Sequence, residues 1–455
     1  MSLWSSAEIA AATNSTVSAD FEVSGVAFDS REVGHGDLFV ALKGEATDGH
    51  CFVAQALAQG AAGILVSDPV DGPHVRVTDT ARALDALGTA SRRRMAGKVI
   101  GVTGSVGKTS VKEALYAALD RGTPGTAHRS LKSYNNHVGV PLSLSRMPRE
   151  TRYGIFEMGM NHAGELAQLT RLVRPDVAIV TAVALAHGAF FADEGAIADA
   201  KGEIFQGLEP GGTAIIPYDS PHRDRLIAAA RPFASQIVTF GRDRAADVWT
   251  RESIGRGTGT LIAARLRGAE VTFTLGQPGA HWVSNALAIL AAVEAVGGDL
   301  PAAGLALAEI TGLAGRGRRL PIVLPGGEAL LIDEAYNANP ASMRATLAVL
   351  GGEKAARRIA ILGSMRELGP SEAQEHAALA GPIAAAGVDF ALLVGSEMEP
   401  LAEALEGTTE FAHVADAAAA AEEARRLIGV GDAVLVKGSN SVGLARVVDA
   451  LAGAA

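Results

Sequence analysis

Residues 98–110, KVIGVTGSVGKTS, combine an apolar run, a glycine-rich turn and a Lys-Thr pair, which together could bind phosphate. Glycines in such a turn let backbone N–H groups close around phosphate oxygens, and the helix that follows points its positive end at the anion. Val102 stands where the usual pattern has a glycine, so this is a shortened G-x-x-G-K-T loop in which Lys108 reaches the outer phosphates and Thr109 ligates Mg²⁺. The pattern predicts a nucleotide site formed by Gly104, Ser105, Val106, Gly107, Lys108, Thr109 and Ser110.

Two further candidates follow strands of the predicted sheet that contains this loop. Glu157 ends the predicted strand 153–158, and His187 lies in the loop after the predicted strand 177–183. Ligands of open parallel sheets bind outside the carboxyl ends of the strands, and carboxylate oxygen and imidazole nitrogen both bind metals. Both residues could therefore face a Mg²⁺ held by Thr109, although a lone histidine in such a loop is more often structural.

Lys201 and Asn285 lie on predicted helices, and each has a simpler alternative. The helix 197–205 has a buried apolar stripe, and Lys201 falls off that stripe, which favours a solvated surface lysine. Asn285 lies one turn into the helix 282–296, where it could touch a base or a ribose. The alternative for Asn285 is a position on an alanine-rich packing helix.

Polar groups also gather at strand ends in the first 96 residues, where Ser30 and Arg31 follow the predicted strand 23–28. Such positions suit anion capture, and ordinary turn residues would explain them equally well. The run 92–94, RRR, closes a helix just before the phosphate-loop strand. We interpret this run as a solvated helix end and linker.

Strands and helices alternate along most of the chain, which predicts an α/β protein with parallel sheets covered by helices. A length of 455 residues corresponds to three domains at roughly 150 residues each. We predict an N-terminal domain at 1–96, a central P-loop ATPase domain at 97–314 and a Rossmann-like C-terminal domain at 315–455. The last domain lacks a G-x-G-x-x-G motif that opens a helix, so no nicotinamide cofactor is expected.

Composition excludes several classes of protein. A net charge of −10 argues against a general nucleic-acid surface, and a single cysteine, Cys51, excludes an intramolecular disulfide and suits a small buried apolar role. No basic leader and no apolar run of about 18 residues occur, so we expect a cytoplasmic protein with no membrane insertion. We expect it to be a monomer.

Taken together, these motifs resemble the ATP-dependent Mur ligases, and within them the D-alanyl-D-alanine-adding MurF branch. The resemblance runs nearly end to end and depends on five segments: GSVGKTSVKE at 104–113, YNNHVGVPL at 134–142, EMGMNH at 157–162, AKGEIF at 200–205 and DEAYNANP at 333–340. The branch that adds meso-diaminopimelate would show Asp-Asn-Pro-Arg in its third domain, and this sequence has none.

The resemblance implies an ATP-dependent peptide ligase of peptidoglycan synthesis that adds D-alanyl-D-alanine to UDP-N-acetylmuramoyl-tripeptide. It implies that Lys108 holds the ATP phosphates, that Thr109 and Glu157 bind one Mg²⁺, and that His187 and Lys201 bind a second, with Lys201 as its N6-carbamate. It places Ser30 and Arg31 on the nucleotide sugar and brings Asn135 and Asn136 to the substrate. The ATP site is completed by residues from later in the chain: Asn285, Arg316, Asp333 and Asn337.

Three positions depart from the family pattern. Trp282 stands where an asparagine commonly follows the histidine of the adenine helix, Ser364 replaces an aspartate, and Asn440 replaces an arginine. The last two weaken the expected contacts of the third domain with D-alanyl-D-alanine and leave the phosphate loop intact. Two alternatives remain open: another amino-acid ligase of the folylpolyglutamate type, and a nucleotide-dependent switch protein.

Overall fold

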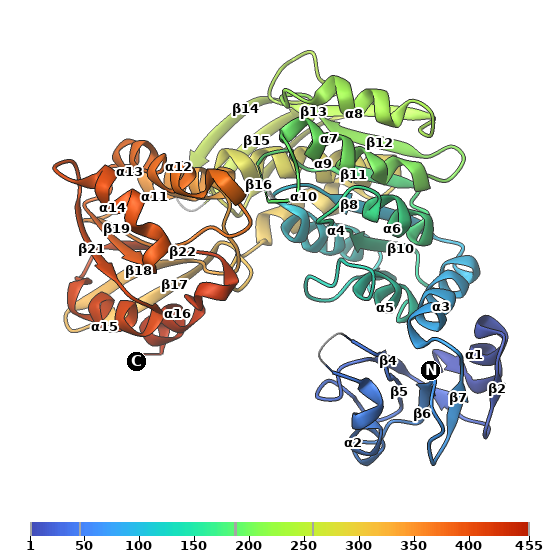
Figure 1. Ribbon diagram of the computed structural model, residues 1–455. Helices are drawn as coiled ribbons and strands as arrows, with labels where there is room; N and C mark the ends of the chain where they lie inside the picture. The colour runs from blue at the N-terminus through green and yellow to red at the C-terminus, as the bar shows by residue number, and fades with distance from the viewer. Residues whose placement is uncertain (1, 45–46, 186–188, 257–258, 454–455) are drawn as a thin grey trace.

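The computed structural model describes residues 2–44, 47–185, 189–256 and 259–453. Its strands form four sheets, and three of these organise an N-terminal, a central and a C-terminal region. Figure 1 shows the central region between the other two, with the N-terminal region at one end and the C-terminal region at the other. Among the described residues, no helix is both long enough and apolar enough to cross a bilayer. The predicted α/β class is confirmed, and the domain limits at 96 and 314 stay predictions.

The N-terminal region has a five-stranded sheet in the order β2-β7-β6-β5-β4, parallel except where β2 joins. Its first helix was not predicted, and it begins with a capping box in which Ser5 and Glu8 each accept the other's backbone N–H. The elements are β1 (Trp4–Ser5), α1 (Ser6–Thr13), β2 (Thr16–Val17), β3 (Glu22–Val23), β4 (Gly25–Ala27), β5 (Asp37–Val40), η1 (Gly49–Phe52), α2 (Val53–Ala58), β6 (Gly63–Val66), β7 (His74–Arg76) and α3 (Thr80–Arg94).

Two expectations for this region were wrong. Cys51 is exposed rather than buried. The arginines that end α3 are not simply solvated, because Arg92 is buried and donates to the carbonyl oxygens of Val173 and Arg174. Arg94 stacks on the ring of Trp4 at 3.5 Å. The end of α3 therefore packs against the central region and fixes the N-terminal region to it.

The central region has a nine-stranded sheet in the order β16-β15-β14-β13-β12-β11-β8-β10-β9. It is parallel from β9 to β14 and ends in an antiparallel meander of β14, β15 and β16. The elements are β8 (Lys98–Thr103), α4 (Lys108–Gly122), β9 (Ala127–Arg129), α5 (Gly139–Ser145), β10 (Tyr153–Glu157), α6 (Glu165–Val173), β11 (Val177–Val180), α7 (Glu194–Gly202), η2 (Glu203–Gly207), β12 (Thr213–Pro217), α8 (Arg223–Ala230), β13 (Gln236–Gly241), β14 (Val248–Arg256), β15 (Gly259–Arg265), β16 (Glu270–Leu275), α9 (Ala280–Ala295) and α10 (Leu300–Glu309).

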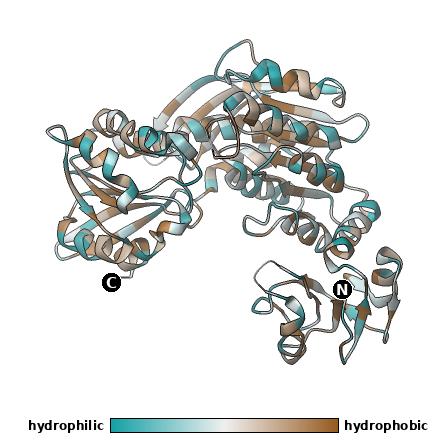
Figure 2. Cartoon of the chain, viewed as in Figure 1, coloured by the Kyte–Doolittle hydropathy of each residue, from teal (hydrophilic) through white to brown (hydrophobic). Residues whose placement is uncertain are grey.

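Both faces of this sheet are apolar, which explains why its strands are continuous hydrophobic runs. Successive residues of a strand point to opposite faces, so Ile155 packs with α4 and α9, whereas Phe156 packs with α5, α6 and α7. Figure 2 shows the same division, with hydrophobic strands inside and hydrophilic residues on the outer helix surfaces. This burial holds the carboxyl ends of β8, β10 and β11 together at one edge of the sheet.

The C-terminal region has a six-stranded sheet in the order β17-β18-β22-β19-β20-β21, parallel except for the hairpin of β17 and β18. Sequence reasoning missed β17, α14 and β21, and it joined α12 and α13 into one helix. The elements are β17 (Arg318–Leu324), β18 (Gly327–Glu334), α11 (Pro340–Gly351), β19 (Arg358–Gly363), η3 (Gly369–Ser371), α12 (Glu372–Ala377), α13 (Ala380–Ala385), β20 (Phe390–Val394), η4 (Ser396–Met398), α14 (Glu399–Leu405), β21 (Glu410–Val414), α15 (Ala417–Leu427), β22 (Ala433–Lys437), η5 (Asn440–Val442) and α16 (Ala445–Ala452).

Candidate active site

The phosphate loop connects β8 to α4, as the sequence predicts. Gly107 precedes the first residue of α4 with a φ of 87°, a conformation that favours glycine. A Cβ on Gly107 would also lie 3.0 Å from Oδ1 of Asn285. Glycine is therefore required here, and Asn285 of α9 lies directly beside the loop.

Lys108 is folded back onto its own loop. Its Nζ donates to the carbonyl oxygen of Gly104 at 2.7 Å, and burial lowers the pKa of this ammonium from its usual value. The lysine is held at the centre of the loop, where an anion that displaced the carbonyl contact would meet a cation that is already positioned.

Three polar side chains, two of them buried, meet at the end of β10. Oγ1 of Thr109 donates to Oε2 of Glu157 at 2.8 Å, and Nδ2 of Asn135 donates to Oε1 of the same carboxylate at 2.7 Å. Thr109 and Glu157 are 5% and 1% exposed. Hydroxyl and carboxylate oxygens are the ligands that Mg²⁺ prefers, so this donor set fits the ion named by the sequence pattern.

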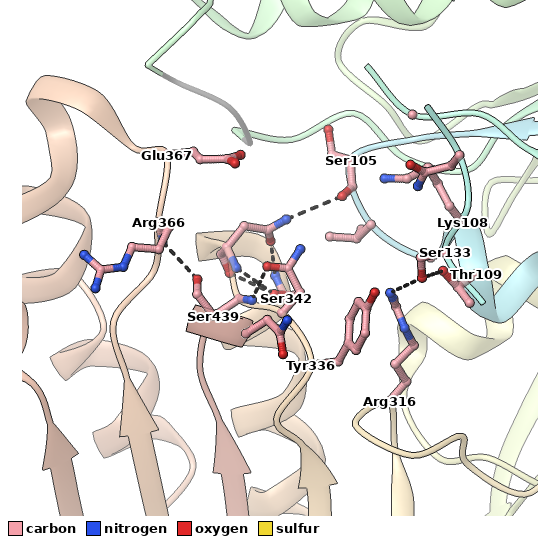
Figure 3. Close-up of a pocket in the computed structure, with 18 of the residues that line it drawn as sticks. Ser105, Lys108, Thr109, Ser133, Arg316, Tyr336, Ser342, Arg366, Glu367 and Ser439 are labelled. Atoms are coloured by element: carbon pink, nitrogen blue, oxygen red, sulfur yellow. Dashed lines mark hydrogen bonds between the residues drawn. The ribbon is translucent and has the colours of Figure 1, made fainter. Parts of the chain in front are cut away.

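The C-terminal region closes over the loop from the opposite side (Figure 3). Arg316 lies 4.2 Å from the centre of the Tyr336 ring, and its guanidinium donates to Oγ of Ser133 at 3.3 Å. Nδ2 of Asn339 donates to the carbonyl oxygen of Ser105 at 3.5 Å. Side chains of the two regions thus meet around the phosphate loop.

A cavity of about 450 Å³ lies between these two sides. It is lined from the central region by Ser105, Val106, Gly107, Lys108, Thr109, Ser133, Asn135, Glu157 and Lys201, and from the C-terminal region by Arg316, Asn337, Arg366 and Asn440, among others. A smaller cavity of about 160 Å³ adjoins Val106, Gly107, Ser110, Trp282 and Asn285. Together the cavities contact most of the predicted ATP residues.

Lys201 is buried at 2% exposure, so the interpretation of a solvated surface lysine was wrong. Burial lowers its pKa well below the usual value, and the charge of Lys108 lowers it further. The helical stripe of α7 could not predict this, because the covering groups come from other parts of the chain. A lowered pKa increases the fraction of lysine present as the neutral amine, which is the form that reacts with carbon dioxide.

Several predicted residues are not in the cavities. Ser30 and Arg31 belong to the N-terminal region, where Oγ of Ser30 donates to Gln55 at 3.4 Å and the exposed Arg31 pairs with Asp29. Asn136 accepts from the backbone N–H of Gly139 at 2.9 Å and so caps α5. His187 lies outside the described residues.

Asp333 does not line either cavity, and its role is to hold a neighbouring turn. Its Oδ2 accepts from the backbone N–H of Gly315 at 2.8 Å and from the guanidinium of Arg318 at 3.1 Å, which fixes the turn that presents Arg316. Sequence reasoning assigned no role to Lys112, Ser133, Tyr336 or Asn339. Three of them lay in segments that carry the family resemblance, Lys112 in 104–113 and Tyr336 and Asn339 in 333–340, whereas Ser133 lay in none.

Two departures from the family pattern, Ser364 and Asn440, follow the adjacent strands β19 and β22 of the C-terminal sheet, and Trp282 lies on α9 of the central region. Asn440 lines the larger cavity and Trp282 lines the smaller one. Ser364 is buried at 1% exposure, and its Oγ has no hydrogen-bond partner among the described residues.

Comparisons with known proteins match this architecture along the chain. Residues 22–96, 102–293 and 318–440 match three family descriptions: "Mur ligase family, catalytic domain", "Mur ligase middle domain" and "Mur ligase, glutamate ligase domain". The UDP-N-acetylmuramoyl-tripeptide--D-alanyl-D-alanine ligase of Escherichia coli K12 is 37% identical, over 95% of this chain and 94% of that protein. The chain belongs to the Mur ligase family.

Solved structures place this Mur ligase near the MurF branch. MurF from Acinetobacter baumannii matches with a TM-score of 0.86 and 31% identity, covering 99% of both chains. MurF from Thermotoga maritima in complex with ADP matches with a TM-score of 0.79 and 25% identity, covering 94% of this chain and 97% of that one.

Proposed function

We propose that this Mur ligase joins D-alanyl-D-alanine to UDP-N-acetylmuramoyl-tripeptide with ATP hydrolysis, and so makes the pentapeptide precursor of peptidoglycan. Near full-length similarity to ligases named for this reaction supports the substrates. The observation that carries the chemistry is the meeting of Thr109, Glu157 and Asn135 beside Lys108, opposite Arg316.

The reaction explains why such a site is needed. A free carboxylate does not condense with an amine at neutral pH, so the ligase first transfers the γ-phosphoryl group of ATP to the tripeptide carboxylate. Phosphoryl transfer is catalysed mainly by positioned cations that meet the developing charge, here Lys108 and Arg316. The amine of D-alanyl-D-alanine then attacks the acyl phosphate, forms the C–N bond and releases phosphate.

The C-terminal region serves a second purpose. Water would hydrolyse the acyl phosphate, so the site must be closed while this intermediate exists. Tyr336, Asn337 and Asn339 cover the phosphate loop from that region. Because these residues belong to the C-terminal region, that region must lie against the phosphate loop for water to be excluded.

Thr109 and Glu157 are the residues that would hold Mg²⁺, and the ion would neutralise charge on the phosphates. For Lys201 the resemblance implies an N6-carbamate that binds a second Mg²⁺ with His187. The burial of Lys201 and its lowered pKa support carbamylation, because only the neutral amine reacts.

Ser30 and Arg31 are proposed contacts of the uridine diphosphate end of the substrate, and Asn135 and Asn136 of its remainder. The predicted domain limits, a cytoplasmic location and a monomeric state belong to the same proposal. Relatives of nearly equal length named for D-alanyl-D-alanine addition disfavour a folylpolyglutamate-type ligase or a nucleotide switch.

Mass spectrometry of the product tests the proposal directly. The full chain is incubated with UDP-N-acetylmuramoyl-tripeptide, ATP and Mg²⁺, with and without D-alanyl-D-alanine. We expect a pentapeptide product and ADP only when the dipeptide is present. ADP release that is independent of the dipeptide, with no new peptide bond, would contradict the ligase and favour a switch protein.

A further inference from the structure

Residues 130–136, between β9 and α5, contact all three regions of the molecule, and we call this segment the bridging loop. From it, Ser133 meets Arg316 of the C-terminal region and Asn135 meets Glu157 of the central sheet. The backbone N–H of Gly159 also donates to the carbonyl oxygen of Asn135 at 2.8 Å. The position of the bridging loop therefore determines how the carboxylate of Glu157 is held.

Lys112 fixes the bridging loop to the phosphate-loop helix. Its side chain is fully buried, and Nζ donates to the carbonyl oxygens of Ser130 at 2.8 Å and Lys132 at 2.6 Å. The same ammonium lies 3.0 Å from Glu113 and 4.0 Å from Oε2 of Glu157. A buried charge is stable only when its hydrogen bonds are satisfied, so the loop carbonyls cannot leave Lys112 without a large cost.

Glu32 fixes the other side of the bridging loop to the N-terminal region. The hydroxyl of Tyr134 lies 3.1 Å from both carboxylate oxygens of Glu32, and Lys132 forms an ion pair with the same group. The hydrogen bond from Lys132 lowers the pKa of Glu32, which keeps the carboxylate charged at neutral pH. Phe28 packs on the Tyr134 ring with centroids 5.7 Å apart.

Glu32 also shares a tight turn with the predicted substrate residues. Its backbone N–H donates to the carbonyl oxygen of Asp29 at 3.0 Å, and Ser30 and Arg31 lie between them. A ligand that rearranges this turn must therefore move the carboxylate that holds Lys132 and Tyr134. The turn is thus linked to Glu157 through Glu32, through Tyr134 and Lys132 of the bridging loop, and through Asn135 of the same loop.

We propose that Glu32 is a positioning residue of the ATP site, which acts through Tyr134, Lys132 and the bridging loop on Asn135 and Glu157. Binding of the nucleotide sugar in the N-terminal region and of Mg²⁺ with ATP at the phosphate loop are thereby coupled. This inference rests on the proposed function, since it takes both ligands from there. Coupling between two sites is reciprocal, so it can be measured from either ligand.

The test measures the dissociation constant of a non-hydrolysable ATP analogue with Mg²⁺, with and without saturating UDP-N-acetylmuramoyl-tripeptide, on the full chain. We expect the analogue to bind wild type about 5-fold tighter or more when the nucleotide sugar is present. Glu32→Gln and Tyr134→Phe should each reduce this ratio below about 2-fold. Tyr134→Phe keeps the ring on Phe28 and removes only the hydroxyl.

Glu8→Gln is the matched control, because the ion pair of Glu8 with Arg149 also joins the N-terminal and central regions and does not involve the bridging loop. This variant should keep the wild-type ratio. The double variant Glu32→Ala with Tyr134→Phe should match Glu32→Ala alone, since the Tyr134 hydroxyl then has no carboxylate to hold.

Four results would overturn the inference: a wild-type ratio of one, an unchanged ratio in Glu32→Gln and Tyr134→Phe, an equal loss in Glu8→Gln, or additive losses in the double variant. A Glu32→Gln protein that binds the nucleotide sugar weakly but keeps the ratio would make Glu32 a direct substrate contact instead. Product formation by wild type is assayed in parallel. If wild type ligates while the ratio contradicts the coupling, only this inference fails, and absence of ligation refutes the proposed function.

Discussion

Lys437 on the C-terminal side of the cleft and Lys201 on the central side are both 2% exposed, and their surroundings differ. Lys437 donates to the carbonyl oxygen of Asn337 at 2.9 Å and lies 3.5 Å from the carboxylate of Glu334. Among the described residues, no carboxylate forms an ion pair with Lys201. Buried Lys437 thus has a carboxylate partner, and Lys201 has none among the described residues.

This difference separates two tasks in one site. Internal pairing makes the strand ends of the C-terminal region a stable frame that presents Tyr336 and Asn337 to the cavity. On the central side burial and the charge of Lys108 lower the pKa of Lys201. The central side is therefore arranged to meet charge that arrives from outside, as phosphate, carbamate or metal.

The largest effect should follow from removing the central cation that faces the phosphates. We expect Lys108→Ala to lower the ligation rate on the order of 100-fold to 1000-fold, because one positioned cation is lost where charge develops. The loop glycines remain, so the melting temperature should change little. Steady-state kinetics on purified Lys108→Ala, with an unfolding curve that matches wild type, tests this prediction. Near-normal turnover would contradict the assignment of the phosphate loop to ATP.

Lys201→Ala should lower the ligation rate nearly as much as Lys108→Ala does, on the order of 100-fold. Lys201→Arg should fail as well, because a guanidinium keeps its charge and cannot be carbamylated. Formate or acetate should restore part of the Lys201→Ala activity by supplying the missing carboxylate.

Intact-protein mass spectrometry in bicarbonate buffer looks for the added carboxyl group on wild type. Lys98→Ala is the control, since the Lys98 side chain is 55% exposed and only pairs with Asp176. An active Lys201→Arg protein, or an unmodified lysine in a fully active enzyme, would refute the carbamate.

The two lysines also show what the sequence could predict. The spacing of the phosphate loop is local, so Gly107 and Lys108 could be placed on their turn and helix start without knowing the fold. The burial of Lys201 depends on the phosphate loop and on residues far along the chain, and no helical periodicity contains that information.

The same limit applies to the interfaces between regions. Arg92 looked like part of a solvated basic run because its acceptors, the carbonyls of Val173 and Arg174, lie some 80 positions later in the sequence. Arg316 could be assigned to the ATP site only by resemblance, since its partner Ser133 belongs to another region. The β/α alternation predicted the sheets, but the edge strands β17 and β21 consist mostly of partly exposed residues and lack the continuous apolar run of a buried strand.

Asn135 and Asn136 provide a matched pair, because Asn135 contacts Glu157 whereas Asn136 contacts the start of α5. Asn135→Ala should reduce activity about 10-fold to 100-fold, because the side chain orients the carboxylate of Glu157. Asn136→Ala should lose about 1 kcal/mol of stability through the lost hydrogen bond at the start of α5 and keep its kcat, while the KM for the nucleotide sugar rises. Chemical denaturation and steady-state kinetics on both variants test this prediction. A large loss of kcat in Asn136→Ala, or a normal kcat in Asn135→Ala, would contradict it.

The last effect is on stability alone, and it concerns His281, a histidine that senses the charge of Lys437. Burial and the charge of Lys437 lower the pKa of His281 to about 4 in the folded chain, against about 6.5 when unfolded. Above pH 6.5 neither state is protonated and the group costs nothing. As the pH falls from 6.5 toward 4, the unfolded chain takes up a proton that the folded chain does not, so stability is lost across that window.

Wild type should therefore lose up to about 2 kcal/mol more than His281→Gln between pH 7 and pH 5. Urea unfolding at the two pH values measures the difference, and His35→Gln, at an exposed histidine, is the control that should track wild type. Replacing Lys437 with methionine should shrink the effect of His281→Gln, because the second cause of the low pKa is then removed. An equal pH dependence in His281→Gln and wild type would show that folding does not lower the pKa of His281.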